Sequence, residues 1–238
     1  MDVIASPLSE IEDRIANNSN LAFYSKQFQE KKLLIINNFV PADFIQHIFL
    51  SEVQNCIPIM HRVKVGSFKK SGSVGSHDLS HHAPHLFALY HSAVMKNFIE
   101  KIVGASLTVS PADDLHAVAL YCYTEAGDHI GVHYDKSFYR GKRYTVLLGL
   151  IQDSKTSKLM CYPGSNKFNR RKNPIEVFTH PGTLVIFDGD VLWHEVTPLS
   201  KNEIRVVLTM EYLTDTRITS FNRFLSHFKD RLLYFGKK

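Results

Sequence analysis

Apolar residues recur every three or four positions in the first part of the chain and every second position from residue 115 onward. The first spacing predicts amphipathic helices, and the second predicts strands that bury one face. A short buried strand is predicted at 32–39, and 61–82 is predicted to be loop with short strand pieces. The predicted helices are two segments within 1–31, one that begins near Pro41, and 84–103, which Gly104 would end.

Turn signals rich in Gly, Asp, Asn and Ser separate the alternating stretches of the second part. The predicted strands are 115–123, 129–135, 143–151, 158–162, 175–179, 183–188, 192–197 and 203–213. Eight short strands at this spacing suit a double-stranded β-helix, the jelly-roll fold. We therefore predict a mainly β (α+β) chain with flanking helices around a cupin-like jelly-roll core.

The whole chain, 1–238, is predicted to form a single domain. Its parts are a mostly helical N-terminal region with a short strand (1–110), the jelly-roll core (111–213) and a C-terminal amphipathic helix (214–238). The C-terminal helix is predicted from Arg217 to Phe235, with apolar residues on one face.

Composition describes an ordinary globular protein, with 44% hydrophobic and 21% charged residues. No apolar run approaches the ~18 residues of a membrane span, so no membrane partner is expected. The N-terminus lacks a secretory pattern and the three cysteines lack C-x-x-C spacing, which favours a reducing, cytoplasmic setting. The net charge of +5 permits an anionic partner, but the basic residues are mostly dispersed, so nucleic acid is disfavoured. A homodimer is left open.

Candidate chemistry begins at His133-Tyr134-Asp135, which closes a strand-like segment. Side chains two apart on a strand share a face, so the imidazole of His133 and the carboxylate of Asp135 would lie side by side. They could supply two ligands of a 2-His-1-carboxylate iron site. Alone the triplet is weak, because a chain with 13 His and 23 acidic residues meets such a spacing by chance.

Two downstream residues strengthen the pattern. His194 follows His133 by 61 residues, and Arg205 follows His194 by 11. Over 115–213 the chain resembles the Fe(II)/2-oxoglutarate-dependent dioxygenases, whose motif is H-x-D, a distant His and then an Arg or Lys about ten residues later. Arg205 lies in an apolar run, where a guanidinium is costly unless paired, and its planar fork suits a carboxylate.

The resemblance implies an enzyme whose cofactors are Fe(II), the cosubstrate 2-oxoglutarate and O2. His133, Asp135 and His194 would be the catalytic iron ligands, and Arg205 would bind the distal carboxylate of 2-oxoglutarate. Tyr123 precedes Gly127 as in the family's Y-x-x-G segment and would add a hydroxyl to that cosubstrate, although a core tyrosine is an equal alternative.

Other conspicuous residues have simpler interpretations. Trp193 should point away from the His194 face and pack. His129 is either a residue of the substrate entrance or a solvated turn histidine, and Asp188-Gly189-Asp190 is predicted to make the turn before His194. The irregularly spaced histidines 77, 81, 82 and 85 are interpreted as loop residues and not as a second metal site.

Asp135 bears on the type of reaction, since halogenases of this class lack the carboxylate. We therefore expect hydroxylation with release of succinate and CO2. The segments around 127–135 and 224–236 are similar to bacterial carrier-independent amino-acid hydroxylases and halogenases, which implies a small-molecule substrate, a free amino acid. Alternatives are a protein or prolyl-type hydroxylase, a nucleic-acid demethylase, which would have a second Arg where Glu211 stands, and a non-enzymatic jelly-roll sensor.

Overall fold

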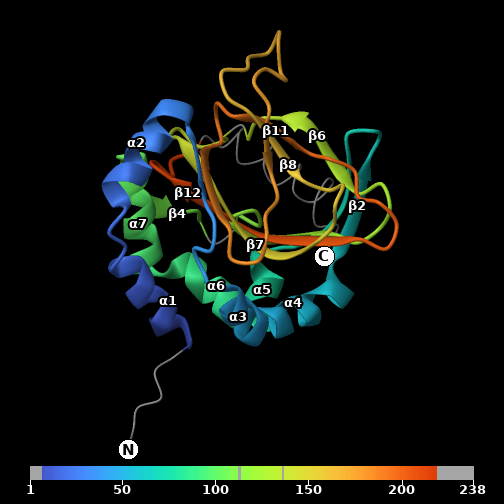
Figure 1. Cartoon of the computed structure of the whole chain (residues 1–238), viewed down its shortest axis with the longest axis horizontal. Coiled ribbons are helices and arrows are strands. Elements are labelled where there is room, and N and C mark those ends of the chain that lie inside the picture. Colours follow the sequence, from blue (N-terminus) through green and yellow to red (C-terminus); the bar gives the residue numbers. More distant parts are fainter. Residues whose placement is uncertain (1–6, 112–113, 136, 219–238) are drawn as a thin grey trace, which may run out of the picture.

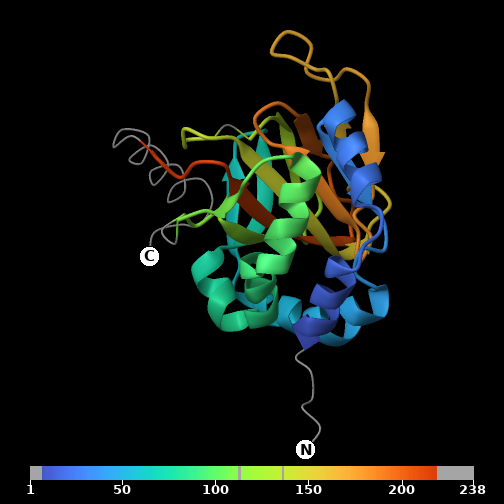
Figure 2. The same cartoon turned by 90° about the vertical axis from the view of Figure 1, so that its left-hand side faces the viewer.

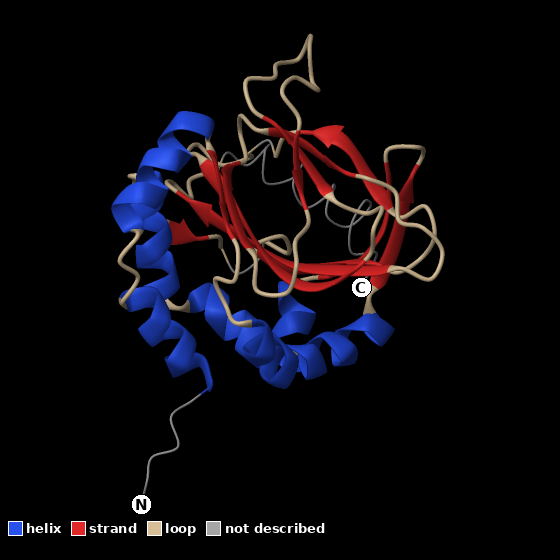
Figure 3. Cartoon of the chain, viewed as in Figure 1, coloured by secondary structure: helices blue, strands red, loops and turns tan. Residues whose placement is uncertain are grey.

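A single curved antiparallel sheet organises the chain, with helices packed against its outside (Figure 1, Figure 3). The computed structural model describes residues 7–111, 114–135 and 137–218. The sheet has 12 strands in the order β1-β10-β7-β12-β5-β3-β6-β11-β8-β9, with β2 paired to β3 and β4 paired to β12. This curled arrangement is the jelly roll that the alternation predicted.

All eight strands predicted from residue 115 onward are present. Their observed bounds are β5 (Val118–Tyr123), β6 (His129–His133), β7 (Arg143–Asp153), β8 (Leu159–Tyr162), β9 (Ile175–Val177), β10 (Leu184–Asp188), β11 (Trp193–Val196) and β12 (Ile204–Leu213). The predicted strand at 32–39 is β1 (Leu33–Ile36), which pairs with β10. Two-residue β4 (Thr108–Val109) completes the sheet beside β12.

The segment 61–82 is more ordered than the sequence suggested. It forms β2 (His61–Val65), β3 (Lys69–Val74) and α5 (Ser76–His82). Strand β3 pairs with both β5 and β6. Its Ser and Gly content hid the strand from the periodicity, although β3 forms a hairpin with the preceding β2 as well as pairing with the more distant β5 and β6.

The N-terminal helices lie where apolar spacing placed them. They are α1 (Pro7–Ala16), α2 (Leu21–Lys31), α3 (Ala42–Phe44), the π-helical turn η1 (Ile45–Phe49), α4 (Leu50–Cys56) and the 3-10 turn η2 (Ile57–Ile59). The helix predicted near Pro41 is thus continued through α3, η1 and α4. No helix of the described residues is long and apolar enough to span a membrane.

The helix predicted over 84–103 is two helices, α6 (Pro84–His91) and α7 (Ala93–Val103). Ser92 stands between them in an extended conformation, and its hydroxyl accepts a hydrogen bond from the Met95 N–H at 3.2 Å. Serine is a favoured N-cap because its side chain satisfies an otherwise free amide of the first turn. Gly104 ends α7 in the left-handed conformation (φ 72°), as predicted.

Along each central strand, successive side chains point alternately into two different environments. On β12, Val206, Leu208 and Met210 join the core beneath the helices, whereas Arg205 and its alternate neighbours face the interior of the curved sheet. In Figure 2, α7 lies against the outer side of the sheet, opposite that interior. The predicted helix from Arg217 to Phe235 falls almost wholly outside the described residues.

Candidate metal centre

His133 and His194 are direct partners across two antiparallel strands. His133 ends β6 and His194 is the second residue of β11, and the pairing register places them opposite each other. Their ring centres are 4.3 Å apart. Paired residues of adjacent strands share a face, so both imidazoles point into the interior of the curved sheet.

Asp135 reaches the same point from the segment that follows β6. Its N–H donates to the carbonyl of Gly189 at 2.8 Å, which holds it against the turn between β10 and β11. A Cβ at Gly189 would lie 3.1 Å from the Cβ of Asp135 and 3.0 Å from the Oγ1 of Thr145. A larger residue at position 189 would therefore have to displace Asp135 or Thr145 by a few tenths of an ångström, and the predicted turn at 188–190 positions Asp135 as well as His194.

The three side chains form a compact set of potential ligands. One ligand atom from each of His133, Asp135 and His194 lies within 4.8 Å of the others. The Nε2 of His133 is 3.4 Å from Asp135 Oδ1, and the Nε2 of His194 is 3.7 Å from Asp135 Oδ2. Within the described ranges this is the only such group of three His, Cys, Asp or Glu residues. Two imidazoles and one carboxylate on one face suit a non-haem Fe(II).

Neighbouring backbone carbonyls orient the two imidazoles so that their Nε2 atoms can bind a cation. The Nδ1 of His133 contacts the carbonyl of Gly131 at 2.8 Å, and the Nδ1 of His194 contacts that of Leu192 at 3.0 Å. Each Nδ1–H can thus donate to a backbone carbonyl, which leaves both Nε2 atoms free to coordinate. Burial, assisted by His133, lowers the pKa of His194 to about 4, so its ring is neutral near pH 7.

Asp135 is the candidate anionic ligand of this group. Burial alone would raise its pKa, but the adjacent His194 and His133 hold the pKa of this carboxyl well below its ordinary value. The hydroxyl of Thr145 donates to Asp135 Oδ2 at 3.0 Å and fixes its orientation. The carboxylate is therefore ionised and held in place, as a metal ligand must be.

Arg205 lies on the side of the two histidines away from Asp135, and no acidic side chain pairs with it among the described residues. The side chain is fully buried (0% exposed), yet none of its three guanidinium nitrogens has a hydrogen-bond partner among the residues that the structure describes. Its guanidinium carbon lies 5.1 Å from the centre of the Tyr123 ring. Burial lowers the pKa of Arg205, although a guanidinium remains charged at any physiological pH. A buried cation with five unused donors implies an anionic ligand.

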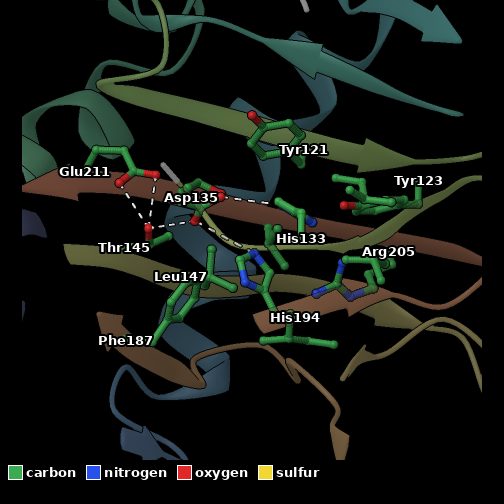
Figure 4. A pocket seen from close by; sticks show the side chains of 15 residues that line it. Tyr121, Tyr123, His133, Asp135, Thr145, Leu147, Phe187, His194, Arg205 and Glu211 are labelled. Carbon is green, nitrogen blue, oxygen red and sulfur yellow. Dashed lines mark hydrogen bonds and ion pairs between the residues drawn. The ribbon is translucent and has the colours of Figure 1, made fainter. Parts of the chain in front are cut away.

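One pocket contains all of the site residues predicted from sequence (Figure 4). Arg205 and Tyr123 lie at one end, Glu211 and Thr145 lie at the other, and the triad stands between them. The lining residues are Tyr121, Tyr123, Ile130, His133, Asp135, Thr145, Leu147, Leu159, Phe187, His194, Val196, Arg205, Val207, Thr209 and Glu211. Their roles as iron ligands and cosubstrate contacts remain predictions.

The other singled-out residues lie elsewhere. Trp193 packs against Tyr134, with ring centres 5.0 Å apart, so its packing role is confirmed. His129 contacts the carbonyls of Gly127 and Ser67 through its two ring nitrogens and does not line the pocket described above.

The histidines interpreted as loop residues are helical. Three of them lie on α5, which the sequence had not predicted, and His85 lies on α6 with its Nδ1 2.8 Å from Glu52. The loop assignment was therefore wrong. No second potential metal-binding group of three was found among the residues that the structure describes.

Sequence reasoning missed Thr145 and Glu211 as pocket residues. The signal for Glu211 was present, because it shares strand parity with Arg205 and stands in an equally apolar run. Thr145 gave no comparable signal. Its importance arises from the pairing of β7 with β12, where Thr145 lies opposite Glu211.

No protein-family model and no curated protein matches the sequence. Solved structures do match the fold. The epimerase SnoN from nogalamycin biosynthesis, described as non-heme and alpha-ketoglutarate dependent, is 12% identical with a TM-score of 0.67, covering 82% of this chain and 81% of that one. SnoN has also been solved in complex with Fe3+, alpha ketoglutarate and nogalamycin RO.

Two prolyl hydroxylases match at similar levels. A Trichoplax adhaerens prolyl hydroxylase, solved with a hypoxia inducible factor peptide, is 19% identical with a TM-score of 0.64, covering 92% of this chain and 95% of that one. A Pseudomonas putida prolyl-4-hydroxylase is 14% identical with a TM-score of 0.61, covering 83% and 99%. The chain therefore has the jelly-roll fold of the Fe(II)/2-oxoglutarate-dependent oxygenases.

Proposed function

We propose that the protein is an Fe(II)/2-oxoglutarate-dependent oxygenase that hydroxylates a small molecule, a free amino acid. The observation that carries the proposal is the unmatched guanidinium of Arg205 in the same pocket as the triad. A metal site alone would fit many proteins. A metal site that shares its pocket with a buried, unpaired cation fits a bidentate organic anion that also reaches the metal.

Each residue of the site would have a separate role. His133, Asp135 and His194 would hold Fe(II) and leave the remaining positions open, and Arg205 would receive the distal carboxylate of 2-oxoglutarate. When bound, iron and 2-oxoglutarate would supply the electrons that reduce and so activate O2. Tyr123 stacks beside the guanidinium and can direct its hydroxyl to the same carboxylate.

Apolar walls complete the arrangement. Leu147, Leu159 and Phe187 line the pocket around the triad and are at most 7% exposed. The ring centre of Phe187 lies 4.8 Å from that of His194. Such walls exclude water from the reacting centre, which strengthens the electrostatic contacts inside and protects a reactive oxidant from side reactions.

Hydroxylation is the reaction that the ligand set supports best. Asp135 supplies the carboxylate, so the coordination position that a halide would need is taken. The choice of a free amino acid rests on the resemblance of the segment 127–135 to amino-acid hydroxylases. Buried, unpaired Cys56, Cys122 and Cys161 agree with a reducing compartment such as the cytoplasm.

A prolyl-type hydroxylase acting on a peptide is the second candidate. It is favoured by the two prolyl hydroxylases among the structural matches. A nucleic-acid demethylase is less well supported, because Glu211 replaces the second arginine expected of that class.

Turnover measurements separate the candidates. Protein reconstituted anaerobically with Fe(II) is mixed with 2-oxoglutarate, O2 and either single free amino acids or proline-containing peptides. Succinate formation that depends on a free amino acid, together with a product one oxygen atom heavier, is expected. Turnover of peptides alone would establish the second candidate, and failure to bind 2-oxoglutarate would overturn the oxygenase proposal.

A further inference from the structure

The hydroxyl of Thr145 contacts two carboxyl groups at once (Figure 4). Its Oγ1 lies 3.0 Å from Oδ2 of Asp135, and 3.1 and 3.3 Å from Oε2 and Oε1 of Glu211. The pairing of β7 with β12 places Thr145 opposite Glu211, so this contact follows from the register of the sheet. Both side chains are at most 5% exposed, and solvent therefore does not compete for these contacts.

One hydroxyl hydrogen is not enough for both acids if both are ionised. A threonine hydroxyl carries a single hydrogen, so Thr145 can donate to only one of the two carboxyl groups. The other carboxylate would then face an oxygen lone pair at the same short distance, which is costly in a buried site. One added proton completes the chain. A neutral Glu211 donates its own hydrogen to Oγ1 of Thr145, and Oγ1 donates to Oδ2 of Asp135.

The surroundings of the two acids decide which of them holds this proton. Burial opposes ionisation of both. At Asp135 the adjacent His194 and His133 overcome it and hold the pKa of the carboxyl well below its ordinary value. At Glu211 burial outweighs the attraction of Arg143 and raises the pKa to about 8. The chain of hydrogen bonds therefore begins at Glu211 and ends at Asp135.

The charges nearby balance when Glu211 is neutral. Arg143 Nε lies 3.7 Å from Glu211 Oε2, too far for a hydrogen bond, and its NH2 lies 3.6 Å from buried Asp114. Asp114 accepts hydrogen bonds from the Tyr139 hydroxyl and the His116 N–H, both at 2.9 Å, which favours its ionised form. One guanidinium thus faces one ionised carboxylate, and a neutral Glu211 adds no unpaired buried charge.

Asp135 needs such support because it lies beyond the end of its strand. β6 ends at His133, and the Asp135 N–H donates to the Gly189 carbonyl at 2.8 Å, which holds the backbone but not the carboxyl group. Thr145 contacts Oδ2, which leaves Oδ1, 3.4 Å from the Nε2 of His133, for a cation. A carboxylate that offers one oxygen takes one coordination position and leaves the others open.

We infer that Glu211 is a positioning residue, which keeps its proton and, through Thr145, holds the carboxyl group of Asp135 so that one oxygen faces the metal. This rests on the proposed function, because it adds a supporting residue to the same metal centre. Glu211 is not one of the three candidate ligands and acts only through Thr145.

Infrared spectroscopy of the metal-free protein tests for the proton directly. At about pH 6 ordinary carboxyl groups are ionised, so a neutral carboxylic acid gives a separate carbonyl band. The band should be present in the wild type, absent in Glu211→Gln and shifted in Thr145→Val, which removes the hydroxyl and keeps the shape. Glu176→Gln, at an exposed glutamate on β9, is the matched control and should leave the band unchanged. A wild type without the band, or a band that either pocket variant leaves unchanged, overturns the inference.

Metal affinity tests the other end of the chain. Mn(II) binding is measured by calorimetry without cosubstrate. Thr145→Val should weaken it by about 10–100-fold, as is typical when a contact to a metal ligand is lost, whereas Thr145→Ser keeps the hydroxyl and should bind close to wild type. Thr179→Val makes the same change at a buried threonine outside the pocket, whose hydroxyl donates to Gln152, and is the control. Unchanged affinity in Thr145→Val overturns the inference.

A double-mutant cycle shows whether Glu211 acts through Thr145. Glu211→Leu should weaken Mn(II) binding by about tenfold in the wild type and should have no further effect when Thr145 is already Val. Equal losses in both backgrounds would contradict the inference. Glu211→Gln should bind close to wild type, because its amide can donate to Thr145 as the neutral acid does.

The glutamine variant decides even if Glu211→Leu fails to fold. An ionised Glu211 would attract a divalent cation, so its replacement by neutral Gln would then weaken metal binding, and such a loss overturns the inference. Failure of the proposed function has a different signature. In that case the metal-loaded wild-type protein does not bind 2-oxoglutarate, whereas the carbonyl band and the Mn(II) affinities still report on Glu211 and Thr145.

Discussion

Arg205 and Tyr123 are direct partners across the antiparallel pair β12 and β5, and the guanidinium carbon lies 5.1 Å from the centre of the tyrosine ring. The aromatic ring offers the cation a weak interaction in place of a counter-ion. Burial raises the pKa of Tyr123 to about 12, so the phenol stays neutral and can donate to an anion without competing for the arginine. The pair is arranged for a ligand that is anionic.

Arg205→Met should stabilise the ligand-free protein. The unpaired buried guanidinium costs about 1–3 kcal/mol, and an apolar side chain of similar length removes that cost. Thermal unfolding with and without 2-oxoglutarate and Mn(II) provides the measurement. We expect a higher melting temperature without ligand and no further increase on adding 2-oxoglutarate. Destabilisation of the empty protein would mean that Arg205 has a structural partner.

Arg205→Lys is the charge-conserving companion. It should weaken 2-oxoglutarate binding by about tenfold or more, because the ammonium cannot form the bidentate contact of a guanidinium. Equal affinity of the two proteins would argue against Arg205 as the cosubstrate anchor.

Replacing His133, Asp135 or His194 by Ala should remove the metal site. Loss of an outer contact to a ligand typically costs 10–100-fold in metal affinity, so loss of a ligand itself should cost more than about 100-fold. Binding of Fe(II) or Mn(II) is measured by calorimetry. His129→Ala, which changes a histidine outside the pocket, is the control and should bind metal normally. Metal binding retained in all three variants would place the site elsewhere.

Glu211 should give the ligand-free protein an unusual dependence of stability on pH. Burial raises its pKa from the ordinary 4.5 to about 8, so the folded protein keeps a proton that the unfolded chain has already lost. The unfolding free energy therefore falls as pH rises from about 4.5 to about 8, by at most about 1.4 kcal/mol per pH unit from this group.

Glu211→Gln should remove that slope. The variant should be more stable than wild type at pH 8, and the difference should vanish as pH approaches 4.5. Denaturant unfolding at several pH values measures both proteins, and Glu176→Gln shows the contribution of an exposed glutamate. A constant difference across this range would indicate that Glu211 keeps an ordinary pKa in the folded state.

The product should gain one oxygen atom, and that atom should come from O2, even in abundant chloride. As an iron ligand, the carboxylate of Asp135 would occupy the position that a halide would need. Mass spectrometry with labelled O2 follows the oxygen. Asp135→Gly should yield little or no chlorinated product, because removing the carboxylate does not by itself provide the surrounding contacts that a halide needs. Chlorination by the wild-type protein would contradict the hydroxylase assignment.

The order and faces of the site strands could be predicted from the sequence. The H-x-D spacing correctly placed His133 beside Asp135, although Asp135 lies just beyond the end of β6 and is held there by Gly189, and Arg205 stood out as a charge within an apolar run. These features depend on period-two alternation, which is a local property of the backbone. The same property predicted every strand of the core from residue 115 onward.

Other features depended on contacts between segments that are distant in sequence. The helix over 84–103 is interrupted at Ser92, which caps α7 and also donates its hydroxyl hydrogen to Glu12 on α1 at 2.6 Å, a contact that apolar spacing does not reveal. Strand β3 pairs with the preceding β2, and the distant strands β5 and β6 join this hairpin to the rest of the sheet. The Ser and Gly residues of that segment have low strand propensity, so its local sequence did not indicate a full strand.

The sequence by itself determined which residues face the interior of the jelly roll and in what order they follow. Only the tertiary structure decided how far apart they lie. The pairing of β6 with β11 brings His133 to His194, and the pairing of β7 with β12 brings Thr145 to Glu211. Alternation fixes the direction of a side chain, whereas strand register and the curvature of the sheet fix its neighbours, and both of these arise from hydrogen bonds between distant segments.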